Sequence, residues 1–301
     1  MGVAAFVLLL LMLATLRRLS ISLRQQKHPT HSTHPTQMQK PTVWKNCELT
    51  GDQCFVNPQC DPTDSDCIVY RLEARIAFIT SYFRPDNLVR RSEIDICLAS
   101  VVGNPVVDEV HVLLEAKDQP LPSFAEHSTK IHQTVIPKRP LMGDFIQYAC
   151  DHLRGQRVIF ANSDIYYDAT LEFFKMVSDA RLNKSFYAVS RWWLSSTGMT
   201  PHPYPLSGSY DTFAFSTDSV CRDATKLKAL VSNLNYTLGV LGAENRLLYE
   251  VSQQYPDLQF YNPAMTVKTL HIHKSPNRSE GWGDRVNEGG KSKSIDPPFV
   301  F

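Results

Sequence analysis

The chain has 301 residues, of which 43% are hydrophobic and 20% are charged, and its formal net charge is +1. This length is enough for one large or two modest domains with a buried core. A charge so close to zero gives no indication of an acidic tail or of a nucleic-acid partner, and we expect neither.

Residues 2–16 form an uninterrupted apolar stretch that is followed by Arg17 and Arg18. The stretch is short for a membrane-spanning helix, which needs about 20 residues. It also lacks the basic start and the A-x-A cleavage site of a signal peptide. We expect residues 1–24 to be an uncleaved signal anchor and its flank, with a cleaved signal peptide as the alternative. Because the arginines follow the apolar stretch, the positive-inside rule would leave the rest of the chain in the cytosol.

Residues 25–46 are poor in apolar side chains and contain the small repeat HPTHSTHPT. Proline, threonine, histidine and glutamine cannot form a core, so this composition predicts an extended stem or linker. Metal binding by the clustered histidines is the alternative interpretation.

The seven cysteines are unevenly placed, with four close together in residues 47–70 and three dispersed. The clustered residues are Cys47, Cys54, Cys60 and Cys67, and the dispersed ones are Cys97, Cys150 and Cys221. The cluster lacks the CxxC pairs of zinc sites, which favours disulfide bonds in an oxidising compartment, with three possible pairings. Reduced thiols in a cytosolic loop are the alternative.

Three N-glycosylation sequons, at Asn183, Asn235 and Asn277, indicate a luminal location. Together with the cysteine cluster they oppose the positive-inside rule, which applies poorly when a large domain follows the apolar segment. We therefore expect a single-pass type II protein of the Golgi or ER membrane, held by its N-terminal anchor, with its globular body in the lumen.

From residue 71 onward the hydrophobic pattern alternates between strands and helices. In the first half we expect strands at residues 75–82, 108–115, 130–136 and 157–162, and helices at residues 86–101, 143–153 and 169–180. In the second half we expect strands at residues 185–191, 211–216, 258–261 and 266–272, and helices at residues 218–230 and 242–253. This alternation predicts an α/β domain with a mostly parallel sheet over residues 71–275, followed by a polar tail at residues 276–301.

The most informative stretch is RVIFANSDIYYD, in which a buried strand ends at Asn162, Ser163 and Asp164 and is followed by Asp168. The carboxyl edge of an open α/β sheet is where ligands bind. Carboxylate and amide oxygens suit Mg²⁺ or Mn²⁺, ions that also bind diphosphates. We expect Asp164, helped by Asn162, to hold a divalent ion that carries a nucleotide diphosphate. The alternative is a solvated turn, because Asn, Ser and Asp are ordinary turn residues.

Two further groups fit such a site. His271 and His273 are two residues apart on a predicted strand, so both imidazoles can point to one face and supply a late metal ligand, or form a structural pair. Glu244 falls in the first turn of a predicted helix, which lowers its pKa but leaves a carboxylate that can act as a general base. Its alternative role is stabilisation of the helix dipole.

Four more residues are candidates for substrate contacts. Arg246 fits a bidentate contact with a donor phosphate, or a pair with a neighbouring side chain. Asp211 follows a Pro/Gly/Ser-rich loop, residues 197–210, and suits sugar hydroxyls or the role of a rival base. Trp192 and Trp193 offer flat faces for a sugar ring, or belong to the core.

Over residues 75–273 the chain resembles GT-A-type nucleotide-sugar glycosyltransferases. The resemblance rests on the motifs RIAFITSY, NSD, SGSYDTFAF, GAENR and NPAMTVKTLHIH, in that order. It implies that Asp164 is the second acid of a DxD motif that holds manganese and the nucleotide diphosphate, with Asn162 in place of the first acid. It also implies that Glu244 is the base of an inverting enzyme, and that His271 or His273 is the late metal ligand.

The expected protein is thus a GT-A-like, Rossmann-like α/β enzyme that uses Mn²⁺ or Mg²⁺. It would move a sugar from a nucleotide-diphosphate donor to a hydroxyl of a glycan or protein acceptor. One alternative is a catalytically inactive luminal carbohydrate-binding or scaffold protein, because Asn162 replaces an acid. Another is a nucleotidyltransferase, although the sequence RPDNLVRR after the first strand is not the Gly-rich basic loop that such enzymes usually carry.

Overall fold

We describe the protein from a computed structural model. The chain divides into two units, residues 1–42 and 43–301. The structure describes residues 74–195, 198–201 and 209–272, three short strands between residues 44 and 71, and residues 286 and 291–295. The expected signal anchor and residues 25–43 of the expected stem lie outside the described residues, as do most of the Cys-rich segment and of the polar tail. Within the described part, no helix combines the length and the apolar character needed to cross a membrane.

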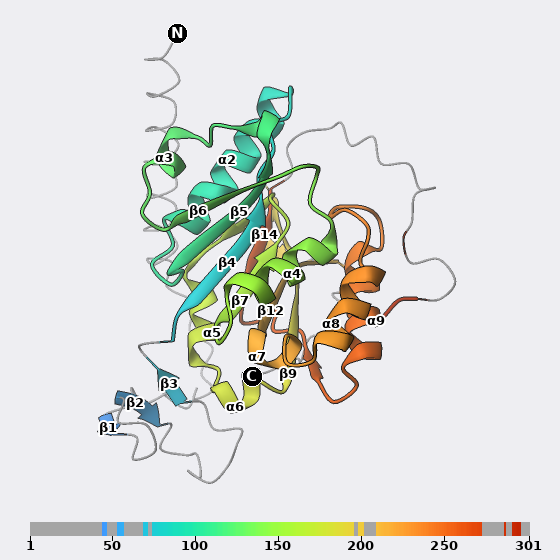
Figure 1. Ribbon diagram of the computed structural model, residues 1–301. Helices are drawn as coiled ribbons and strands as arrows, with labels where there is room; N and C mark the ends of the chain where they lie inside the picture. Colours follow the sequence, from blue (N-terminus) through green and yellow to red (C-terminus); the bar gives the residue numbers. More distant parts are fainter. Residues whose placement is uncertain are drawn as a thin grey trace. The chain divides into compact units, whose positions relative to one another are not determined.

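A seven-stranded sheet, in the order β13-β9-β12-β7-β4-β5-β6, carries the second unit (Figure 1). Four of its neighbouring pairs are parallel, while β12 runs antiparallel to both of its neighbours. The expectation of an α/β fold with a mostly parallel sheet is therefore confirmed. The strands are β4 (Ile76–Ser81), β5 (Glu109–Glu115), β6 (Ile131–Ile136), β7 (Arg157–Ala161), β9 (Ser185–Ser190), β12 (Tyr210–Ser216) and β13 (Gln259–Tyr261).

Helices cover both faces of this sheet, so its central strands β4, β7, β9 and β12 are buried on both sides. Successive residues of β4 alternate between two hydrophobic clusters, with Phe78 in one and Ile79 in the other. The first cluster includes the buried stripe of α2 (Leu88–Val102), and the second includes those of α4 (Met142–His152), α8 (Ala224–Asn233) and α9 (Ala243–Gln254). Figure 1 shows α2 and α4 on opposite sides of β4 and β5.

A second sheet of four short strands, in the order β11-β10-β14-β8, lies beside the turn that follows β7. The strands are β8 (Ile165–Tyr167), β10 (Trp192–Ser195), β11 (Gly198–Pro201) and β14 (Thr269–His271). Strand β14 runs antiparallel to β8 with His271 opposite Ile165. This pairing carries a residue from near the end of the chain to the carboxyl end of β7.

The helix expected at residues 169–180 is wrong, because the chain there forms three short helical segments. They are η2 (Ala169–Glu172), α5 (Phe173–Met176) and α6 (Asp179–Leu182). Asp168 caps the first segment by accepting from the amide of Thr170, and Ser178 caps the last by accepting from the amide of Arg181. Side chains of this kind start a new helix rather than continue an old one.

The helix expected at residues 218–230 is split in the same way, into α7 (Thr217–Val220) and α8. The carboxylate of Asp223 accepts from the amides of Thr225 and Lys226 and so begins α8 as a separate helix.

Two of the three dispersed cysteines are joined beside this break. A disulfide bond links Cys150 on α4 to Cys221, the residue that follows α7.

The remaining described elements belong to neither of these two sheets. They are the antiparallel strands β1 (Trp44–Asn46), β2 (Gln53–Val56) and β3 (Val69–Arg71), the 3-10 turn η1 (Ala116–Asp118) and the short helix α3 (Ser123–Glu126).

Candidate functional site

A pocket of about 170 Å³ opens at the carboxyl ends of β4 and β7. Ser81 ends β4 at its wall, and Asp164 lies just beyond β7. Five residues predicted from the sequence line this pocket together: Asn162, Asp164, Asp211, Glu244 and His271. Groups far apart in the chain are thus brought to one edge of the sheet, as the site hypothesis requires.

Asp164 forms the centre of one half of the pocket and is only 5% exposed. Its Oδ2 lies 3.1 Å from Nε2 of His271 and 2.7 Å from Nη2 of Arg90. Burial alone would raise the pKa of Asp164, but the hydrogen bond and charge of His271 and the charge of Arg90 outweigh it and hold the pKa well below its usual range. The carboxylate is therefore ionised at neutral pH.

Local structure fixes both partners of this carboxylate. His271 is held by β14, and the amide of Ile272 donates to the carbonyl oxygen of Asp164 at 3.1 Å. Arg90 lies in the first turn of α2, where the side chain of Asn87 accepts from its backbone amide. A second contact, 3.0 Å from Nη1 of Arg90 to Oε2 of Glu93, holds the guanidinium in place.

Asp164 and His271 fit a divalent ion by chemistry and spacing. A hard ion such as Mn²⁺ or Mg²⁺ with bonds of about 2.1 Å holds adjacent octahedral ligands about 3.0 Å apart. Oδ2 of Asp164 and Nε2 of His271 are 3.1 Å apart. Such ions are commonly held by one or two protein groups and by substrate phosphates. Arg90 contacts the same oxygen of Asp164, and its guanidinium adds a positive charge to this half of the pocket.

Glu244, Asp211 and Asn162 form the other half. Nδ2 of Asn162 donates to Oδ1 of Asp211 at 2.7 Å and lies 3.5 Å from Oε1 of Glu244. Nε of Arg191 lies 2.7 Å from Oδ2 of Asp211, which is 2% exposed. The amide of Asn162 thus spans two carboxyl groups, one of which is paired with an arginine.

Burial, and next the negative charge of Asp211, raise the pKa of Glu244 to about 7. The expectation that the helix N-terminus lowers this pKa is therefore wrong. The helix start is present, since Glu244 lies in the first turn of α9, but desolvation and a like charge are the stronger effects here. A carboxyl group with a pKa near 7 is well suited to take up a proton at neutral pH.

The loop that leads into α9 forms part of the pocket wall. Residues 238–242 line the pocket, and two of them, Gly239 and Gly242, have φ angles of 79° and 82°. Only glycine adopts this left-handed conformation without strain. Gly242 is also the N-cap of α9, so it sets the direction in which Glu244 enters the pocket.

Arg246 is not among the residues that line the pocket. Its Nε lies 2.6 Å from Oε1 of Glu250, one helical turn further along α9, and its Nη1 donates to the carbonyl oxygen of Val286 at 3.2 Å. Arg246 therefore pairs with a neighbouring side chain, which is the alternative that the sequence left open.

The two tryptophans also lie outside the pocket lining. Nε1 of Trp192 donates to the carbonyl oxygen of Ala264 at 2.7 Å, and the ring lies under Lys268 Nζ at 5.5 Å. Trp193 is 45% exposed on β10. His273 lies outside the described residues.

Three arginines that the sequence reading did not assign line the pocket: Arg90, Arg139 and Arg191. The sequence RPDNLVRR offered a signal for the first, since a basic helix start after the first strand faces the same sheet edge. Arg191 directly precedes the tryptophans, and nothing in its sequence neighbourhood indicates its partner Asp211.

No protein-family model matches the chain, and no curated protein sequence matches it. Among solved structures, it is similar to TarS 1-349 of S. aureus, with 11% identity and a TM-score of 0.44, covering 66% of this chain and 60% of that one. It is similar to the mannosyltransferase PcManGT of Pyrobaculum calidifontis in complex with GDP-Man and Mn²⁺, with 14% identity, a TM-score of 0.42 and coverage of 68% and 58%. It is also similar to 4-diphosphocytidyl-2C-methyl-D-erythritol synthase of Anaerococcus prevotii, with 10% identity, a TM-score of 0.40 and coverage of 63% and 87%.

The chain thus matches only 60% and 58% of the length of the first two structures. At these TM-scores the similarities carry no argument about function, which must come from the geometry of the pocket itself.

Proposed function

We propose that the protein is a glycosyltransferase that moves a sugar from a nucleotide-diphosphate donor to an acceptor hydroxyl. One observation carries the proposal: a single pocket holds an ionised carboxylate between an imidazole and a guanidinium at one end, and a carboxyl group with a pKa of about 7 at the other. The first end suits a diphosphate, and the second suits a hydroxyl that must lose a proton.

At the donor end, Asp164 and His271 would hold Mn²⁺ or Mg²⁺. The amide of Asn162, expected from the sequence to help hold the ion, instead contacts Asp211 and Glu244. When bound, the ion supplies positive charge to the departing diphosphate. Arg90 adds a planar cation that pairs with phosphate oxygens. These residues bind and orient the donor, and the contacts of Asp164 with His271 and Arg90 favour its ionised form.

At the acceptor end, Glu244 is the better of the two candidate bases. Asp211 already has Arg191 and Asn162 at 2.7 Å on its two oxygens. The negative charge of Asp211 raises the pKa of Glu244 and so favours the protonated form of Glu244 after transfer. Glu244 takes the proton from the acceptor hydroxyl if the enzyme inverts the sugar, and Asp211 tunes and positions it.

Donor binding and proton transfer can be separated by two variants. Asp164→Ala should weaken binding of nucleotide-diphosphate sugars in the presence of Mn²⁺ by at least about 10-fold in calorimetry, because the carboxylate that holds the ion is lost. Glu244→Gln should bind the donor as the parent does, yet transfer sugar about 100- to 10,000-fold more slowly.

Asp218→Ala, which removes an exposed carboxylate at the start of α7, is the matched control and should change neither property. Unchanged donor affinity in Asp164→Ala would remove the donor site, and full activity in Glu244→Gln would remove the base.

A further inference from the structure

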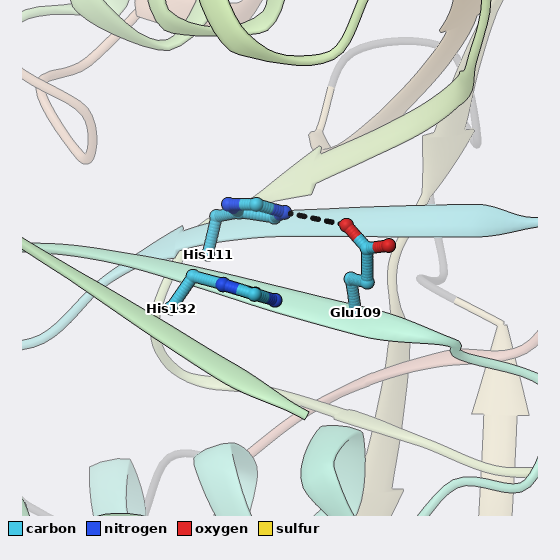
Figure 2. A group of neighbouring side chains, drawn as sticks. All are labelled: Glu109, His111 and His132. Atoms are coloured by element: carbon cyan, nitrogen blue, oxygen red, sulfur yellow. Dashed lines mark hydrogen bonds and ion pairs between the residues drawn. The ribbon is translucent and has the colours of Figure 1, made fainter. Parts of the chain in front are cut away.

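A second group of chemically active side chains lies on β5 and β6, away from the pocket (Figure 2). Glu109 and His111 are two residues apart on β5, so they share one face of the sheet. His132 on β6 is the direct neighbour of His111 in the strand register. The two imidazoles are stacked, with their ring centroids 4.7 Å apart and their planes 14° from parallel. In Figure 2 both rings extend toward Glu109.

The three side chains bring possible metal-ligand atoms together. One atom from each of the three lies within 4.8 Å of the other two. Nε2 of His111 is 3.3 Å from Oε2 of Glu109. A tetrahedral zinc ion with bonds of about 2.0–2.1 Å holds its ligands about 3.4 Å apart. His111 and Glu109 already have that spacing, and His132 is exposed, so its side chain has room to rotate the remaining distance.

The neighbours of the cluster fix the orientation of its buried member. Nδ1 of His111 lies 3.0 Å from the hydroxyl of Tyr148 on α4, which also accepts from Oγ1 of Thr134 at 3.3 Å. When Nδ1–H donates to Tyr148, a lone pair on Nε2 faces the carboxylate of Glu109. Two acceptors then face each other, and a cation between them satisfies both. Metal-bound histidines commonly have this kind of contact at their second nitrogen.

The cluster is separate from the pocket. Glu109 opens β5 beside Ala77, whereas the pocket begins at Ser81, at the other end of β4. Those two positions on β4 are about 13 Å apart along the strand. The carboxylate of Glu109 also forms an ion pair with the exposed side chain of Arg75 through its other oxygen. Oε2 therefore stays directed at His111.

We propose that Glu109, His111 and His132 bind a zinc-class divalent transition-metal ion. Two imidazoles and one carboxylate are ligands that zinc prefers, and three protein ligands leave a fourth position for water. Because β6 is the last strand of the sheet, the ion ties this edge strand to β5. Binding therefore stabilises the pairing of β5 with β6, without taking part in the chemistry of the pocket.

The test is calorimetric titration of the full chain with ZnCl₂ and no nucleotide. The stem histidines His28, His31 and His34 are a rival zinc site in the sequence, so the parent for the titration is the triple variant in which all three are alanine. This parent should still bind one zinc ion. At a zinc concentration 100 times the Kd, its thermal unfolding midpoint should rise by about 5 °C.

Two further substitutions in this background locate the site. His132→Ala should raise the Kd by at least about 10-fold, and Glu109→Gln should do the same. His132 is exposed, so its variant should keep the metal-free unfolding midpoint of the parent and so report on binding rather than on folding. His127→Ala, at another exposed histidine, should leave zinc binding unchanged. Adding Asp164→Ala to the parent removes the pocket as a rival zinc site, and the zinc ion bound by the cluster should remain.

The proposal is wrong if the triple variant binds no zinc, or if His132→Ala binds zinc as tightly as its parent. In either case the cluster is a hydrogen-bonded pair of stacked histidines in which Nε2–H of His111 donates to Glu109.

Discussion

Ionisation of Glu244 is unfavourable in the folded protein, because its carboxyl group is buried and lies next to the charge of Asp211. Its pKa rises from the ordinary 4.5 to about 7. A group with a raised pKa stabilises the fold fully below its unfolded pKa, and this stability is lost as the pH rises through the folded pKa. The window for Glu244 therefore runs from about pH 4.5 to about pH 7.

The direction of this pKa shift predicts how the stability of the Glu244→Gln variant depends on pH. The variant has no carboxyl group to ionise, so it should equal the parent at pH 4.5 and exceed it in free energy of unfolding by about 1–3 kcal/mol at pH 8. Urea unfolding at both values measures the difference. Glu126→Gln, an amide substitution at an exposed position on α3, controls for the change of side chain. A gain of equal size at both pH values would show that the raised pKa is not its cause.

At the scale of single residues, the sequence identified five side chains of the pocket but not how they are charged or paired. Asp164 was found because it follows a buried strand, and Glu244 because it opens a helix. Arg90 was missed because an arginine at an amphipathic helix start is usually a solvated residue, and the sequence does not show that its guanidinium pairs with Asp164. The direction of the pKa of Glu244 was also missed, because a helix start can be seen in sequence whereas burial beside Asp211 cannot.

In the part of the chain that the structure describes, helix α4 is held by a disulfide bond as well as by packing. The disulfide from Cys150 to Cys221 closes a loop with a sequence separation of 71. A loop of this length restricts the unfolded chain enough to contribute about 2–4 kcal/mol. Replacing both cysteines by serine should lower the free energy of unfolding by that amount in urea titration.

Cys97→Ala is the matched control, because Cys97 is a buried free thiol on α2. This substitution removes packing but no cross-link, and it should lower the free energy of unfolding by about 1 kcal/mol. Peptide mapping without reductant should recover Cys150 and Cys221 in one linked fragment. Recovery of the two as separate thiols would argue against the bond.

Long periodic elements could be predicted, whereas short ones could be predicted only in part: β13 and β14 were expected and β8 was not. The stripes of α2, α4 and α9 span several turns, and their predicted ranges lie within a few residues of the observed ones. Strand β8 has three residues, too few to show alternation, yet it places His271 beside Asp164. The helix expected at residues 169–180 is interrupted because Ser178 caps a new helical segment at Asp179, and a serine at this position is a helix-start signal in the sequence.

For the whole molecule, the compartment is a proposal: a single-pass type II arrangement in the Golgi or ER membrane with a luminal catalytic domain. The disulfide supports an oxidising compartment. Asn235, the acceptor of one sequon, is exposed, as a glycan requires. Protein expressed in a secretory-pathway host should therefore lose mass on glycosidase treatment. The Asn235→Gln variant should lose less mass than the parent. No change on treatment of the parent would argue against a luminal domain.

The central claim is that one pocket both holds a nucleotide-diphosphate sugar and deprotonates an acceptor. Turnover of a panel of such sugars, with and without Mn²⁺, tests it most directly when the parent, Asp164→Ala and Glu244→Gln are compared. We predict that the parent consumes at least one donor in the presence of Mn²⁺, and that both variants are slower by about 100-fold or more. The claim is contradicted if no donor on the panel is consumed, or if the two variants turn over as fast as the parent.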